Sequence, residues 1–154
     1  IALTWTLIAL AGIDLRTQLL PDAMTLPLLW GGLLLTLIPL FASPEQAILG
    51  AAAGYLSLWS VYWGFKLLTG KEGMGYGDFK LLAALGAWFG AVSILPIVLL
   101  SSAAGALIGG LMILLRGRDS QLPMPFGPFI AVAGYAYMML SPQLHSWLPF
   151  FVLE

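Results

Sequence analysis

The chain has 154 residues, of which 60% are hydrophobic and 8% are charged, and its net charge is −1. A soluble domain carries about 25% charged residues, so this composition predicts a helical membrane protein embedded in a lipid bilayer and gives no basic surface for nucleic acid. The absence of cysteine excludes disulfides, thiolate metal sites and a cysteine nucleophile.

Apolar runs predict about six membrane-crossing helices in one all-α domain. Crossing a bilayer takes about 20 residues, so the first and fourth runs are short. Because Ile1 already lies in an apolar run with no charged leader, we expect further sequence before it. A short tail, 143–154, is expected at the membrane interface. The runs cover residues 1–15, 23–41, 46–68, 79–91, 93–115 and 125–141.

The first run carries an acid, Asp14, close to its end. A negative charge at a helix C-terminus opposes the helix dipole, and ionisable residues in membrane segments usually have a function. An ion pair with Arg16 is the structural alternative. We favour a functional role for Asp14.

The second run begins at Pro21-Asp22, where Asp22 is suited to cap the free N–H groups of a helix. We favour this capping role for Asp22 over direct catalysis.

Charge predicts the orientation of the helices. The basic residues fall in or beside the first, third and fifth connections, which the positive-inside rule places in the cytoplasm. Asp14 and Asp78 then lie on the cytoplasmic side, and Glu45 lies on the opposite side. The basic residues are Arg16, Lys66, Lys71, Lys80, Arg116 and Arg118.

The fourth run follows the segment 73–78, which reads Gly-Met-Gly-Tyr-Gly-Asp. Its three glycines give backbone freedom and allow another chain to come close, and its last residue is Asp78 at the mouth of a helix. Asp78 could cap that helix, which is compatible with catalysis. The segment lacks the Gly-Lys-Ser/Thr ending of a phosphate-binding loop.

Two membrane acids on one side suggest an aspartyl protease. Carboxyl groups held close in a low-dielectric site cannot both ionise, so one acts as a base and the other as an acid without a metal or organic cofactor. A small proton- or ion-coupled transporter and a non-catalytic assembly subunit are the alternatives. No inverted repeat is visible, and both acids lie at one edge, whereas transporter sites lie near the midplane.

Small residues spaced four apart predict close helix packing. We favour packing within the chain over dimerisation, and the oligomeric state stays open. The pairs are Gly50 with Gly54, Gly86 with Gly90, and Gly105 with Gly109.

Three segments together resemble the type IV prepilin peptidases, which cut by a Gly-x-Gly-Asp aspartyl mechanism. They are 13–22 (Ile-Asp-Leu-Arg-Thr-Gln-Leu-Leu-Pro-Asp), 71–80 (Lys-Glu-Gly-Met-Gly-Tyr-Gly-Asp-Phe-Lys) and 123–128 (Pro-Met-Pro-Phe-Gly-Pro). The resemblance extends over nearly all of the chain. It implies a presenilin-like architecture, with Asp14 and Asp78 as the catalytic pair.

The resemblance also implies a location and substrates. Such enzymes lie in the bacterial inner membrane with the active site facing the cytoplasm. They remove the leader from type IV prepilins and type II secretion pseudopilins, after a glycine and usually before phenylalanine. Asp22, Gly75, Gly77 and Lys80 are then supporting residues on the substrate side.

Bifunctional members also methylate the new N-terminus from S-adenosylmethionine. They carry a cytoplasmic segment with two Cys-x-x-Cys pairs, expected to bind zinc, before the region matched here. Since this chain has no cysteine, we expect zinc and S-adenosylmethionine only in a preceding part of the parent protein.

Overall fold

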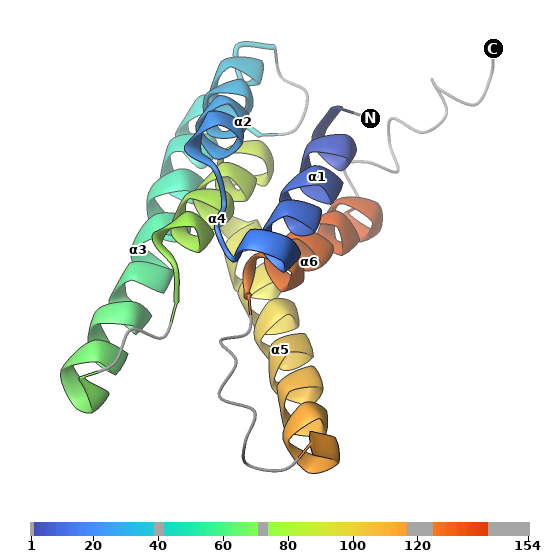
Figure 1. The fold of residues 1–154 in the computed structure, drawn as a ribbon. Helices are drawn as coiled ribbons and strands as arrows, with labels where there is room; N and C mark the ends of the chain where they lie inside the picture. Colours follow the sequence, from blue (N-terminus) through green and yellow to red (C-terminus); the bar gives the residue numbers. More distant parts are fainter. Residues whose placement is uncertain (1, 39–41, 71–73, 117–124, 142–154) are drawn as a thin grey trace.

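A computed structural model describes residues 2–38, 42–70, 74–116 and 125–141, and all regular structure in these ranges is helical (Figure 1). The all-α prediction is therefore confirmed. The predicted tail, Gly73, Lys71 and Arg118 lie outside the described residues. The helices are α1 (Ala2–Thr17), α2 (Asp22–Leu35), α3 (Pro44–Thr69), α4 (Tyr76–Phe89), a 3-10 turn η1 (Ala91–Ser93), α5 (Ile94–Arg116) and α6 (Gly127–Leu140).

Local sequence signals explain both ends of α3. The hydroxyl of Ser43 accepts a hydrogen bond from the backbone N–H of Gln46 at 3.3 Å, and Pro44 occupies the first turn, where its missing N–H is not needed. Gly70 ends the helix in the left-handed region, with φ +70°, and its N–H donates to the carbonyl of Lys66. A residue with a Cβ is strained in that conformation, so glycine is the natural stop.

The short fourth helix is the centre of the fold. Most residues of α4 are buried, because α2, α3 and α6 pack around it. The indole N–H of Trp88 donates to the carbonyl of Leu28 at 2.8 Å and joins α4 to α2. A helix enclosed by other helices has no bilayer thickness to match, which explains how α4 can have only 14 residues.

Glycines bring the backbones of α3 and α4 into contact. A methyl group on Gly50 would overlap the carbonyl of Gly86, and one on Gly54 would lie 2.7 Å from the carbonyl oxygen of Leu82. The prediction that these glycines serve packing within the chain is confirmed for Gly50, Gly54 and Gly86. Gly105 instead makes ordinary contacts with Phe126.

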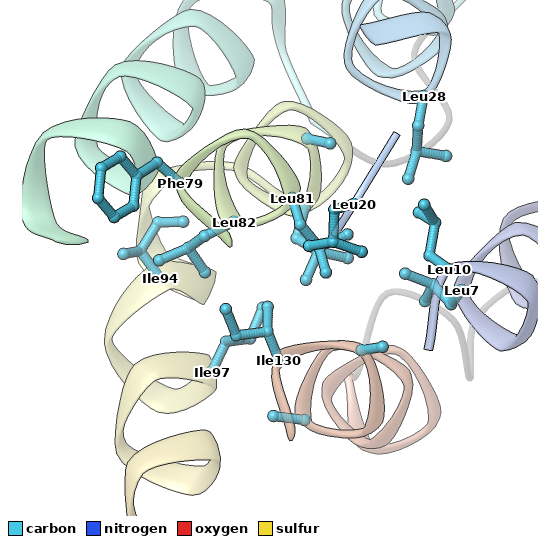
Figure 2. Packing of buried hydrophobic residues seen from close by; sticks show 14 of the residues in the cluster. Leu7, Leu10, Leu20, Leu28, Phe79, Leu81, Leu82, Ile94, Ile97 and Ile130 are labelled. Atoms are coloured by element: carbon cyan, nitrogen blue, oxygen red, sulfur yellow. The ribbon is translucent and has the colours of Figure 1, made fainter. Parts of the chain in front are cut away.

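A single apolar core connects these helices (Figure 2). Figure 2 shows leucines of α1 and α2 and isoleucines of α5 and α6 gathered around the leucines of α4. The fully or nearly fully buried members include Leu7, Leu10, Leu28, Phe79, Leu81, Leu82, Ile97 and Ile130. Because α4 contributes to the core along its whole length, its first turn is held rigidly, and that turn contains Asp78.

Among the described helices, one stretch, Ala91–Met112, is long and apolar enough to cross a bilayer by itself. Helices α2 and α6 are apolar but have 14 residues each. The observed fold therefore supports six helices, while the number of complete spans stays a prediction.

Four helix ends lie near one another in the fold. In Figure 1 the C-terminus of α1 lies beside the N-terminus of α6, while α3 and α5 extend further toward the bottom of the view. The start of α2 is joined to the first half of α4 by the pairing of Asp22 with Lys80. This arrangement brings together residues far apart in the sequence, including the described residues of all three segments that resemble the peptidase motifs.

Candidate active site

Asp14 lies one turn before the end of α1 and is only 4% exposed. The helix ends at Gln18, whose φ is +55° and whose N–H donates to the carbonyl of Asp14 at 2.8 Å. Oδ2 of Asp14 is buried and has no hydrogen-bond partner in the part of the chain that the structure describes. Arg16 is exposed and forms no ion pair with Asp14 there, so the structural alternative for Asp14 is wrong.

Asp78 is also buried, with 6% of its surface exposed, and is the third residue of α4. Gly75 occupies the N-cap position, and the backbone N–H of Asp78 donates to its carbonyl at 3.2 Å. Asp78 thus occupies the third helical position, where the acid of a capping box lies near the backbone N–H of the cap residue. The apolar run predicted the start of this helix at residue 79, but α4 begins three residues earlier, at Tyr76, and Asp78 lies inside it.

The two acids line one cavity of about 530 Å³. Their carboxyl groups are near enough to interact electrostatically. The cavity also contains the four supporting residues that the sequence predicted, so all six candidate residues share one site. The lining is Asp14, Gln18, Leu19, Leu20, Asp22, Met74, Gly75, Tyr76, Gly77, Asp78, Lys80, Pro125 and Phe126.

Asp22 does not cap α2 as predicted. Pro21 occupies the N-cap position, and no side chain caps this helix end. The carboxylate of Asp22 instead pairs with the ammonium group of Lys80 at 2.6 Å and so joins α2 to α4. The side chain of Asp22 is 56% exposed, in contrast to the buried pair. Asp22 therefore has a charge partner of its own at the edge of the cavity.

The glycines before Asp78 differ in their surroundings. A methyl group on Gly77 would lie 2.6 Å from Cβ of Leu20, so this glycine lets the connection between α1 and α2 pack on the first turn of α4. A methyl group on Gly75 would meet nothing within 4 Å. The packing of Leu20 against the backbone therefore explains why residue 77 is a glycine. At Gly75, in contrast, the space beside the backbone is open and forms part of the cavity wall.

The start of α6 contributes residues to the site that no sequence pattern identified as functional. Pro125 and Phe126 line the cavity, and Gly127 lies directly against the carboxyl group of Asp14. The one indication in the sequence that these residues belong to the site was the resemblance of segment 123–128 to the third peptidase motif. Among the described residues, the cavity included, no three His, Cys, Asp or Glu side chains gather as a metal site would require.

Comparison with known proteins links this site to one family. The type IV leader peptidase family matches residues 1–110 of the chain, which include both buried acids. No solved structure matches the chain significantly.

Curated relatives are similar over most of the chain. The prepilin leader peptidase/N-methyltransferase of Aeromonas hydrophila is 57% identical over 145 residues, which cover 94% of this chain and 50% of that protein. The proteins of the same name from Xanthomonas campestris and Pseudomonas aeruginosa are each 57% identical, over 94% and 92% of this chain and 50% and 49% of their own lengths. The chain thus spans about half the length of these relatives.

Proposed function

The chain belongs to the type IV leader peptidase family, and from this premise we propose that it is the peptidase part of an aspartyl endopeptidase that removes leader peptides from type IV prepilins and type II secretion pseudopilins. The single observation that carries the proposal is the burial of Asp14 and Asp78 in the wall of one cavity. The names of its relatives agree with this activity.

The chemistry follows from two carboxyl groups that share one proton. The ionised carboxylate takes a proton from a water molecule as the water oxygen attacks the carbonyl carbon of the scissile peptide. The protonated carboxyl group donates its proton to the carbonyl oxygen, which gives a tetrahedral diol. The carboxyl group that took the proton from water then donates it to the peptide nitrogen, and the other carboxylate takes a proton from a hydroxyl group of the diol. The C–N bond breaks, which leaves a new carboxyl end and a new amino end and returns the pair to its starting state with one proton.

We propose that the chain crosses the bacterial inner membrane several times with the cavity facing the cytoplasm. Large apolar side chains are exposed on helices all around the molecule, and such surface needs lipid or a partner to cover it. The basic side chains described are Arg16 in the last turn of α1, Lys66 in the last turn of α3 and Lys80 in the first half of α4, which are the helix ends that the positive-inside rule assigns to a cytoplasmic face. The exposed residues include Trp5, Trp30, Ile48, Leu107 and Val132.

Methyl transfer is proposed only for the parent protein. The relatives' names include an N-methyltransferase, and this chain matches half of each relative. Its residues do not fit a thiolate zinc site, since the chain contains no cysteine. We therefore assign zinc and S-adenosylmethionine to a part of the parent protein outside these 154 residues. No step of the peptidase reaction involves them.

The test is leader removal from a purified prepilin by the full-length protein in detergent. Asp14→Asn and Asp78→Asn keep the shape of each side chain and remove its acid–base chemistry, so each should slow cleavage by about 10²- to 10⁴-fold. Glu45→Gln removes a charge from the first turn of α3, away from the cavity, and should cleave at the wild-type rate. Full cleavage by Asp14→Asn or Asp78→Asn would overturn the assignment of the pair.

A further inference from the structure

The start of α6 places a glycine against one of the two acids. Phe126 is at the N-cap, Gly127 is the first helical residue and Pro128 follows. The first N–H groups of a helix have no partner within it, and the backbone of Gly127 lies directly against the carboxyl group of Asp14. The positive end of the α6 dipole therefore faces this carboxyl group.

There is no room at this position for a side chain. A methyl group on Gly127 would lie 2.5 Å from Oδ2 of Asp14 and 3.0 Å from its Cγ. Glycine at 127 is not required by its backbone conformation, because the glycines with positive φ in the described residues are Gly70 and Gly90. The missing Cβ is therefore what lets the acid and the helix end meet.

Leu20 connects this contact to the second acid. A methyl group on Gly127 would lie 3.1 Å from Cδ1 of Leu20, and one on Gly77 would lie 2.6 Å from Cβ of the same residue. Gly77 immediately precedes Asp78 in α4. The backbones beside both acids therefore pack against the same leucine side chain. A displacement of Gly127 would displace Leu20 and so change the position of one carboxyl group relative to the other.

We propose that Gly127 is a positioning residue of the peptidase, an inference that rests on the proposed function. Its missing Cβ and its N–H hold the Asp14 carboxyl group in the arrangement with Asp78 that the reaction needs. This assigns a role to the third motif, which the catalytic chemistry leaves unexplained. Displacing a reacting group by about 1 Å can slow catalysis by as much as 10²-fold.

The experiment compares two alanine substitutions on the same helix in the full-length protein. Gly127→Ala forces a methyl group against Asp14, while Gly134→Ala forces one against the side chain of Leu85 in the core, at 2.6 Å. We expect Gly127→Ala to lower kcat by about 10- to 100-fold, with KM within twofold, and to move the pH profile of kcat. Gly134→Ala should lower Tm at least as much and leave kcat and its pH profile unchanged.

A third variant separates positioning from packing. In Gly127→Ala/Leu20→Ala the contact with Leu20 is relieved and the contact with Asp14 stays, so this variant should fold and still have a low kcat. A wild-type kcat in either variant that contains Gly127→Ala would overturn the positioning role, and so would an equal loss of kcat in Gly134→Ala. If the wild type cleaves no prepilin, the proposed function itself is overturned and the positioning role with it.

Discussion

Each acid of the pair faces the backbone amide of a glycine at a helix N-terminus. Asp78 meets Gly75 at the start of its own helix, whereas Asp14 meets Gly127 at the start of α6. Backbone amides at helix ends are fixed donors that do not reorganise during a reaction. Both acids therefore lie beside the start of a helix, although Asp14 comes from the last turn of α1 and Asp78 from the first turn of α4.

The ion pair between Asp22 and Lys80 supports the site from its edge, and its removal should have a small effect. Exposed pairs contribute about 1 kcal/mol or less. We expect Asp22→Asn and Lys80→Met each to lower the free energy of unfolding by no more than this amount and to keep cleavage within about tenfold of wild type. Thermal unfolding at low and high salt, together with the prepilin assay, measures both effects.

The double variant Asp22→Asn/Lys80→Met provides the control for this prediction. If the two residues act only through each other, the double variant should resemble the singles. Loss of cleavage in Asp22→Asn as complete as in Asp14→Asn would place Asp22 among the catalytic groups and contradict this assignment.

At the scale of the element, the contact between α3 and α4 depends on missing side chains. A methyl group on Gly50 would overlap backbone atoms of Gly86, which cannot rotate away as a side chain can. Gly50→Ala should therefore reduce the free energy of unfolding by about 3 kcal/mol, the upper end for overpacking. Gly64→Ala on the same helix meets open space and should be neutral or stabilise by up to about 1 kcal/mol. Equal Tm values for the two variants in detergent would contradict this account of the contact.

Helix positions could be predicted from the sequence because their signals are local. Ser43-Pro44 starts α3 and Gly70 ends it, and both signals depend only on neighbouring backbone groups. The error at α4 has the same origin. Asp is a common cap and Gly is a weaker one, so sequence reasoning put the helix after Asp78, while the structure caps it at Gly75.

The site could be predicted only in part, because its members come from four helix ends. Asp14 and Asp78 were recognisable as acids beside apolar runs, which is a property of each segment alone. The contact of Gly127 with Asp14 and the pairing of Asp22 with Lys80 depend on how α6 meets α1 and how α2 meets α4. No local pattern encodes those distances, so Gly127 was not predicted to have a role, and the capping role predicted for Asp22 was wrong although its place in the site was predicted.

At the scale of the molecule, one end carries the cavity and the other does not. The ends of α1, α2, α4 and α6 that carry the cavity residues lie together. The N-terminus of α3, with Glu45 in its first turn, lies instead beside the C-terminal end of α4, where Gly90 packs against Gln46. If the bilayer separates these two ends, the leader of a substrate can reach Asp14 and Asp78 from one compartment only.

Labelling of introduced cysteines tests this orientation. The 154 residues contain no cysteine. Labelling of the unsubstituted full-length protein therefore measures any cysteines outside them, and the increase in each variant reports on the introduced position. Thr17→Cys lies at the exposed end of α1 beside the cavity, and Glu45→Cys lies in the exposed first turn of α3. In intact spheroplasts a membrane-impermeant maleimide should label Glu45→Cys and reach Thr17→Cys only after lysis. Labelling of Thr17→Cys before lysis, with Glu45→Cys protected, would invert the molecule and place the acids on the periplasmic side; equal labelling of both would mean that the bilayer does not separate these two ends.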